Sequence, residues 1–254
     1  HWGIGVSSSN GLRKEVDFIS TIRNFLSSRA DAVVLYSDFP LELYSRSVRA
    51  KTFVANNTIF NPFSKDFSPV PKKHFLFIGT LNARKGLDVL IKCFAEFIRK
   101  SPTVSIRKLV IIGDGPEKSS LVQLSRSLGL DLNVEFTGSI SDDEKKREFF
   151  SEAIASFSLR QAGLSVLESF SYGVPFVCFQ NAISGGEHLN VIDNVNGFLA
   201  EGPDDIVKIM ELISSDRVLA KRIGGNAYQH FSVHRSMEAM VDGFESSFQF
   251  VIQK

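Results

Sequence analysis

Short apolar runs alternate with helical patterns along most of this chain, and this alternation restricts the choice of fold more than any other feature. The strand-like runs occupy residues 74–81, 109–115, 133–140, 153–159 and 174–179. The helical patterns cover residues 86–100, 117–130, 142–153 and 203–215. Strands that alternate with helices form βαβ units, which build a parallel sheet with helices on both faces. The sequence therefore predicts an α/β fold with a Rossmann-like parallel sheet.

The first 70 residues predict a second, shorter α/β unit. Its expected helices and strands alternate over residues 15–30, 31–37, around 40–47 and 51–56. Residues 61–73 hold three of the eight prolines, a composition typical of a linker. Because the chain begins at His1 in sequence that reads as the middle of a domain, we expect a fragment with a truncated second domain.

The bulk composition excludes several classes of protein. The net charge is +1, whereas nucleic-acid binding usually requires a basic excess. No run approaches the roughly 18 apolar residues of a transmembrane helix. Cys93 and Cys178 lie far apart in apolar runs, which indicates core thiols of a reducing compartment. The 23 phenylalanines are interpreted as core residues.

His230 and His234 are four residues apart, a spacing that suits a metal pair on one helix. No third ligand is near them in sequence. We expect two final helices with a break near Ser232, so that SVHRS opens the second helix. The prediction is that the chain has no metal site.

Glycines follow the predicted strands at the points where ligands of open α/β sheets bind. Gly79, Gly113 and Gly138 each end a strand, and Gly163 lies in the loop after the next one. The carboxyl ends of parallel strands share one edge of the sheet, so we expect these loops to lie together. The sequence places the candidate site at that edge.

Two of these loops carry the charges that a nucleotide or phosphosugar needs. Arg84 and Lys85 stand just before a helix, where cations and free backbone N–H groups suit a pyrophosphate; a solvated basic turn is the alternative. The stretch RQAGLSVLESFSYG, residues 160–173, contains a small-residue loop and then a helix. Its inner face is expected to be Leu164, Leu167 and Phe170. Glu168 on this helix suits hydrogen bonds from sugar hydroxyls.

A third loop, SGGEHLN at residues 184–190, follows the 174–179 strand on the same edge. Its Glu187 and His188 are candidates to face a sugar or an acceptor. A plain surface turn is the alternative interpretation.

Several motifs, taken in order and spacing, resemble the C-terminal domain of glycosyltransferase family 4. They are IGTLNARKGLDVLI, LVIIGDGPE, VEFTGSI, GLSVLESFSYGVPFV and DNVNGFL. The resemblance covers about residues 70–230 and implies a retaining enzyme of GT-B fold. It implies three regions: the end of the N-terminal acceptor domain with a linker (1–70), the nucleotide-sugar domain (71–228) and a return helix that packs toward the N-terminal domain (229–254).

The resemblance also implies roles for residues of the first strand and its loop. Lys85 matches the lysine that contacts the donor's phosphates, and Gly79 matches the glycine of the first strand end. Thr80 stands where the family usually has an arginine for the same phosphates. We expect Arg84 to supply the missing charge, so that Lys85 and Arg84 together stabilise the leaving diphosphate.

The remaining roles fall on the later loops. Glu168 matches the second glutamate of the family's E-x7-E signature, which holds the donor ribose, and Arg160 stands where the first glutamate belongs. Gly163 and Leu164 match the loop that meets the diphosphate and sugar, while Gly138 ends a strand on the same edge. Glu187 lies in the loop equivalent to the Gly-Gly-x-Pro-Glu region. Arg160 raises the prospect of an anionic donor sugar or acceptor.

The function implied is transfer of a sugar, with retention, from a nucleotide-diphosphate sugar to a polysaccharide or lipid-linked acceptor. The partners implied are a nucleotide sugar and a glycan or glycolipid acceptor, with no nucleic acid, and the expected location is cytoplasmic, at the membrane face. No metal or other cofactor is expected. The alternatives are a non-catalytic nucleotide-sugar-binding relic and a GT-B phosphorylase or epimerase. A dehydrogenase is disfavoured because no G-x-G-x-x-G motif follows a strand.

Overall fold

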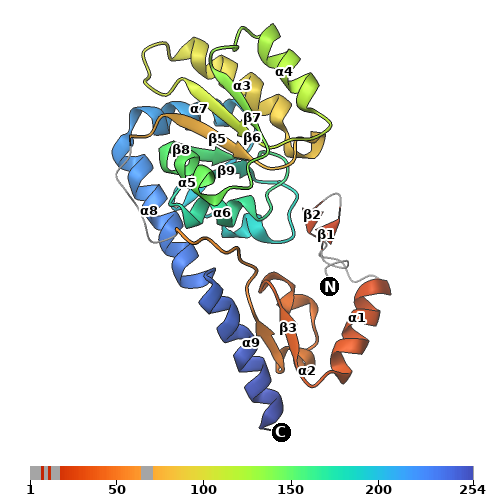
Figure 1. The fold of residues 1–254 in the computed structure, drawn as a ribbon. Helices are drawn as coiled ribbons and strands as arrows, with labels where there is room; N and C mark the ends of the chain where they lie inside the picture. The colour runs from red at the N-terminus through yellow and green to blue at the C-terminus, as the bar shows by residue number, and fades with distance from the viewer. Residues whose placement is uncertain (1–6, 9–10, 13–17, 64–70, 254) are drawn as a thin grey trace.

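The computed structural model describes residues 7–8, 11–12, 18–63 and 71–253, and a parallel sheet forms the centre of the larger part (Figure 1). Its strands are β5 (His74–Ile78), β6 (Lys108–Ile112), β7 (Val134–Gly138), β8 (Ala153–Phe157), β9 (Phe176–Phe179) and β10 (Gly197–Ala200). Their order in the six-stranded sheet is β10-β9-β8-β5-β6-β7. All neighbouring strands pair in parallel. This is the doubly wound order, in which the chain moves outward from the centre in both directions.

Helices cover both faces of the sheet because the strand side chains alternate between them. One face packs against α3 (Leu87–Lys100), α4 (Lys118–Ser127), α7 (Pro203–Ser215) and the first half of α8 (Arg217–His234). The other face packs against α5 (Asp143–Glu152), α6 (Ser165–Ser171) and the second half of α8. The expected arrangement of helices on both faces is confirmed.

Phenylalanine fills much of the core, as expected. On β5, Phe75 and Phe77 face α3, and the alternate residue Leu76 faces α5. The Phe75 ring meets those of Phe94 and Phe157 edge to face, with centroids 6.1 Å and 5.5 Å away. Such pairs contribute about 0.5–1.5 kcal/mol each beyond the area that they bury. Both cysteines are free and buried.

The N-terminal unit is smaller and lies beside the C-terminus. It contains the antiparallel pair β1 (Ser7–Ser8) and β2 (Gly11–Leu12), then α1 (Phe18–Arg29), β3 (Val33–Leu35), the 3-10 turn η2 (Phe39–Leu43), α2 (Arg46–Arg49) and β4 (Thr52–Val54). β3 and β4 pair in parallel, with Val33 opposite Thr52. The last helix, α9 (Met237–Ile252), lies along this pair (Figure 1). The Phe53 and Phe250 rings meet there, with centroids 5.3 Å apart.

Three details of the expected elements were wrong. The helix expected around residues 40–47 is the turn η2 followed by the four-residue α2, because the backbone is extended at Tyr44 and Ser45 between them. The break expected near Ser232 lies at Arg235–Ser236, where the Ser236 side chain accepts a hydrogen bond from the Ala239 N–H and caps α9. The strand β10 was not expected, since GFLA is short and lacks a strand pattern.

In the described part of the chain, no helix is long and apolar enough to cross a membrane. The three-region division at residues 70 and 228 stays a prediction.

Candidate functional site

The sheet has a topological switch point between β5 and β8, which are neighbours in space. The loop after β5 runs to α3 on one face, and the loop after β8 runs to α6 on the other. Ligands of open α/β sheets bind in the crevice that such diverging loops leave. Here the two loops are joined, because the Arg160 N–H donates to the Lys85 carbonyl at 3.4 Å.

Glycine lets the loops at the ends of β5, β6 and β7 interlock. A Cβ on Gly113, whose φ is +142°, would lie 1.9 Å from the carbonyl oxygen of Gly79. The Gly113 N–H donates to the Gly138 carbonyl at 2.9 Å, and the Leu81 N–H donates to the Asp114 carbonyl at 2.9 Å. The structure thus brings Gly79, Gly113 and Gly138 together at one edge of the sheet.

Arg84 and Lys85 lie on a 3-10 turn, η3 (Ala83–Lys85), directly before α3. The Arg84 side chain is exposed and that of Lys85 is half-buried. Burial lowers the pKa of Lys85, the neighbouring Arg84 lowers it further, and Glu187 acts in the opposite sense. Thr80, also predicted here, is exposed at the same strand end. The turn therefore presents two cations at the N-terminus of a 14-residue helix.

Arg160 joins this basic group from the other side of the crevice. Its side chain crosses Gly86, where a Cβ would lie 2.9 Å from the Arg160 Cγ. Gly86 has a φ of +73°, so glycine is suited here both by conformation and by the close approach. The Arg160 Nη1 then lies 3.3 Å from Asp88 Oδ1 in the first turn of α3. The guanidinium is nearly half exposed, and a ligand in the crevice can reach it.

The loop before α6 differs from its expected packing at one position. Leu164 was expected on the inner face with Leu167 and Phe170, but its side chain is 44% exposed while those two are buried. Leu164 comes before the first residue of α6, and its side chain lies outside the core. Gly163 has no atom within 4 Å of the place where a Cβ would be, which leaves space beside it.

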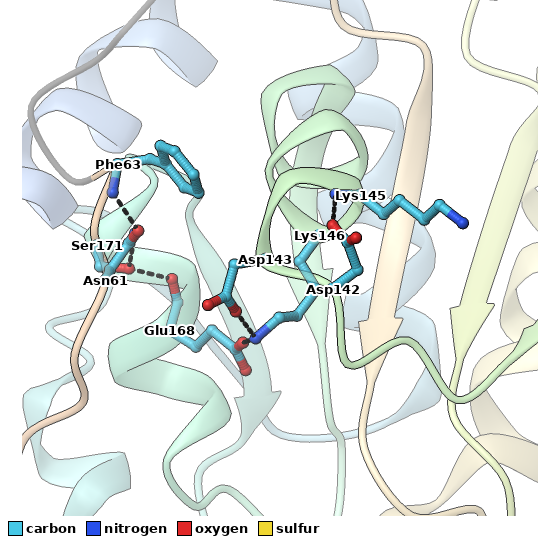
Figure 2. Close-up of polar contacts among 8 residues, drawn as sticks. All are labelled: Asn61, Phe63, Asp142, Asp143, Lys145, Lys146, Glu168 and Ser171. Atoms are coloured by element: carbon cyan, nitrogen blue, oxygen red, sulfur yellow. Dashed lines mark hydrogen bonds and ion pairs between the residues drawn. The ribbon is translucent and has the colours of Figure 1, made fainter.

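Glu168 projects from α6 toward α5 (Figure 2). Its Oε1 lies 3.6 Å from Lys146 Nζ, and that ammonium lies 2.7 Å from Asp143 Oδ1. Burial raises the pKa of Glu168, and the Lys146 charge opposes the rise. Glu168 is therefore a half-buried carboxylate with one cation beside it, suited to accept hydrogen bonds from hydroxyl groups.

Glu187 lies in the 3-10 turn η4 (Glu187–Asn190) and lines a cavity of about 600 Å³ between the two parts of the chain. Its carboxylate accepts hydrogen bonds from Ser184 Oγ, the Gly185 N–H and Asn57 Nδ2, at 3.1, 3.0 and 3.2 Å. The cavity walls are largely polar and include Tyr36, Ser37, Asp38, Asn56, His230 and Arg235. Such a lining suits a polyhydroxylated molecule.

His188, predicted together with Glu187, does not line this cavity. Burial lowers the pKa of His188, and Glu187 opposes the change. Its Nδ1 is buried without a hydrogen-bond partner among the described residues. Its backbone N–H donates to Ser184 Oγ, which keeps the loop closed.

Other residues of the crevice were not identified from the sequence. Lys146 and Asn57 reach Glu168 and Glu187 from distant parts of the chain, so no local pattern signals them. Asn82 Oδ1 and Ser165 Oγ are buried without a partner among the described residues, in the two loops that flank the switch point. Unsatisfied buried polar groups of this kind point to a functional site.

The two histidines of the predicted pair also come together in the structure. His230 and His234 both lie on α8, with ring centroids 5.4 Å apart. His230 Nε2 shares a hydrogen bond of 3.1 Å with Asn190 Oδ1, and burial lowers its pKa to about 4. Across the described ranges, no group of three or more His, Cys, Asp or Glu side chains is placed to hold a metal ion.

The family model described as "Glycosyl transferases group 1" matches residues 61–230 of this chain. A curated protein of Haemophilus influenzae, an "Uncharacterized glycosyltransferase", is 26% identical over 200 residues, which are 77% of this chain and 55% of that protein. The chain thus spans about half the length of this relative.

Solved structures give the same fold. A mutant of S. aureus TarM in complex with fondaparinux, alpha-GlcNAc-glycerol and UDP aligns with a TM-score of 0.71 and 18% identity, over 96% of this chain and 49% of that one. Anabaena HepE in complex with UDP aligns with a TM-score of 0.72 and 19% identity, over 91% of this chain and 67% of that one. The GT-B type of α/β fold expected from the sequence is confirmed.

Proposed function

The chain belongs to the glycosyl transferases group 1, and from this membership we propose that it transfers a sugar from a nucleotide-diphosphate sugar to a polysaccharide or lipid-linked acceptor. We assign it to glycosyltransferase family 4, with retention at the anomeric carbon. One observation carries the proposal: Arg84 and Lys85 stand at the N-terminus of α3, at the switch point of the sheet.

Lys85 and Arg84 act on the leaving group in this proposal. When the bond between the anomeric carbon and the diphosphate oxygen breaks, its electron pair stays on the diphosphate. The two side chains and the free N–H groups of α3 stabilise that growing charge. The acceptor oxygen bonds to the anomeric carbon from the same face, so its proton passes to the adjacent phosphate oxygen. No step requires a metal ion.

The donor lies along the glycine edge of the sheet. The residues that we assign to it are Gly79, Thr80, Gly138, Arg160, Gly163, Leu164 and Glu168. Gly79, Gly138 and Gly163 leave room for a close approach of the ligand to the backbone. Glu168 accepts the ribose hydroxyls, and Arg160 faces the donor sugar or another anionic group of the substrate.

The acceptor enters the cavity that Glu187 lines. Burial lowers the pKa of Lys85 while Glu187 partly opposes this, so the carboxylate is within electrostatic reach of the diphosphate site. We therefore propose that the cavity opens beside the reacting centre. We propose Glu187 as an acceptor-side contact, with His188 holding its loop. A polysaccharide or lipid-linked acceptor is consistent with work at the cytoplasmic face of a membrane.

A non-catalytic nucleotide-sugar-binding relic is the second candidate. It is favoured by Arg160, a cation at the position where the resemblance implies a glutamate. In the structure Arg160 forms an ion pair with Asp88 at the crevice. According to this hypothesis, the chain binds the donor but does not turn it over.

Thermal unfolding with a panel of UDP-, GDP-, ADP- and CDP-sugars tests the proposal, since a ligand of the native state raises the melting temperature. We expect one nucleotide to stabilise the chain, and Lys85→Ala to weaken its binding by about 10- to 100-fold through loss of a charged contact. Lys92→Ala, at an exposed position on the same helix, is the matched control.

Two results would contradict these assignments. Full donor affinity in Lys85→Ala removes the phosphate role of this residue. Binding without hydrolysis or transfer, together with turnover restored by Arg160→Glu, favours the relic. In the enzyme as proposed, transfer is unchanged by EDTA.

A further inference from the structure

Lys146 lies between two carboxylates from different helices. Its Nζ is 2.7 Å from Asp143 Oδ1 on its own helix, α5, and 3.6 Å from Glu168 Oε1 on α6. The Lys146 and Glu168 side chains are only 21% and 24% exposed. Figure 2 shows the ammonium pointing into the gap between the two helices, with Asp143 and Glu168 on either side.

The backbone that carries Glu168 is also fixed. Ser171 Oγ donates to the Glu168 carbonyl at 2.8 Å and accepts a hydrogen bond from Asn61 Nδ2 at 2.8 Å. Asn61 in turn accepts the Phe63 N–H at 2.9 Å. The last turn of α6 is thus attached to the segment that joins the two parts of the chain. With the backbone held, the direction of the Glu168 carboxylate depends on what its side chain contacts.

Charge and burial oppose each other at Glu168. Burial raises the pKa of this carboxyl, Lys146 lowers it, and Asp143 raises it again. Tyr172 is the residue directly after α6, and its pKa is raised to about 12, mainly by burial. The charges of Glu168, Asp143 and Glu144 also raise this pKa, and the charge of Arg147 lowers it. Within this group Lys146 is the cation that lowers the pKa of Glu168, so it favours the ionised carboxylate.

We propose that Lys146 is a positioning residue for the donor: it keeps Glu168 ionised and directed toward the ribose, without contacting the donor itself. This inference rests on the proposed function, in which the ribose hydroxyls donate to Glu168. An ionised carboxylate accepts with both oxygens, whereas a protonated one gives up part of that capacity. Asp143 holds the long lysine side chain in place, so that the pair acts on Glu168 as a unit.

The test measures affinity against pH for whichever of UDP, GDP, ADP and CDP binds the chain most tightly. Because only the ionised Glu168 binds well, the affinity of the unmodified chain falls as the pH drops through the pKa of this group. Lys146→Met removes the opposing charge, so its loss of affinity moves to higher pH. We expect Lys146→Met to bind more weakly than the unmodified chain at low pH, by about tenfold for each pH unit that the midpoint moves, with the difference lost at high pH.

Three variants give the comparison. Lys146→Arg keeps the charge and is expected to retain most of the affinity, and Glu168→Gln is expected to bind weakly with a flat pH profile. Lys208→Met is the matched control, because Lys208 also pairs with an aspartate three residues earlier, at 3.1 Å, on α7 at the other face of the sheet. It is expected to bind like the unmodified chain at every pH.

The 2′,3′-dideoxy analogue of the same nucleotide tests the ribose directly. The unmodified chain is expected to lose about tenfold in affinity when the hydroxyls are absent, which corresponds to one good hydrogen bond to a charged group. Lys146→Met, measured at a pH below the midpoint of its own profile, is expected to lose little, since Glu168 is protonated there.

The outcomes separate this inference from the proposed function. The inference is overturned if the affinity of Lys146→Met follows the same pH profile as that of the unmodified chain. It is also overturned if Lys146→Met loses the same affinity at every pH, because that result indicates direct contact with the donor. In both cases the proposed function stands if Glu168→Gln weakens binding. If none of the four nucleotides binds, or Glu168→Gln binds normally, the ribose assignment fails and the inference fails with it.

Discussion

At the scale of single residues, His74 shows how burial sets a response to pH. It is 3% exposed at the start of β5, and its Nε2 shares a hydrogen bond of 2.9 Å with the Phe149 carbonyl. Burial lowers its pKa to about 4, more than the Phe149 bond and Glu152 raise it. The folded chain therefore holds this imidazole neutral at a pH where the unfolded chain protonates it.

We expect this group to make the fold less stable in weak acid. Between the unfolded pKa of about 6.5 and the folded value of about 4, the unfolded state binds more protons, so stability falls as the pH drops through that window. The expected loss is about 2–3 kcal/mol at pH 4. Urea unfolding at pH 7, 6, 5 and 4 measures the free energy of unfolding against pH. In His74→Gln this free energy is expected to fall less between pH 7 and pH 4. If the free energy of unfolding falls equally with pH in the unmodified chain and in His74→Gln, His74 is not the group responsible.

A second residue-scale prediction concerns Gly113. A methyl group there would lie 1.9 Å from the Gly79 oxygen, and the positive φ adds backbone strain. Gly113→Ala is expected to lower the free energy of unfolding by about 3 kcal/mol and to disturb the donor crevice. Gly202→Ala is the control, because nothing lies within 4 Å of its Cβ position. Unchanged stability of Gly113→Ala in urea would show that the three loops are not interlocked as described.

At the scale of elements, the sequence predicted the large α/β part well, because each strand and helix there has its own local pattern. The stretches 109–113 and 174–179 are nearly continuously apolar, and the structure buries both strands between helices. Local signals were insufficient where an element is short. GFLA forms β10 by pairing with β9, and Leu164 leaves the core because α6 begins one residue later.

Side-chain partners across elements could not be predicted in the same way. Glu168 was identified, but its partner Lys146 was not, since the pair depends on how α5 and α6 lie side by side. Arg160 was assigned to the crevice, while its contact with Asp88 across Gly86 depends on the angle between two loops. Periodicity reports which face of an element is buried, and it does not report what that face meets.

At the scale of the whole molecule, a few polar contacts join the two parts of the chain around the cavity. Asn57 Nδ2 donates to Glu187, and Asn56 Nδ2 donates to the His234 carbonyl at 3.4 Å. Thr58 Oγ1 donates to the Arg235 carbonyl at the break between α8 and α9. These contacts set the shape of the cavity that we assign to the acceptor.

We therefore expect Asn57→Ala to affect the acceptor and not the donor. Loss of a part-buried hydrogen bond to a carboxylate costs about 1–1.5 kcal/mol, so the acceptor KM is expected to rise about 5- to 10-fold. The dissociation constant of the nucleotide is expected to stay the same, which thermal unfolding with added nucleotide checks. Asn226→Ala on α8, which removes a surface contact to the Val195 carbonyl, is the control. Equal losses for donor and acceptor would show that the contact supports the fold in general.

The packing of α9 on β3 and β4 has a consequence for synthesis of the protein. Domains generally fold as units while the chain is made, beginning at the N-terminus. The Phe53 ring on β4 meets Phe250, and Gly243 on α9 lies so close to β4 that a Cβ would be 2.3 Å from the Val54 oxygen. Both of these α9 residues, which pack on β4, emerge from the ribosome after the entire large sheet. The N-terminal unit is therefore translated before the large sheet, yet its packing is completed only after that sheet.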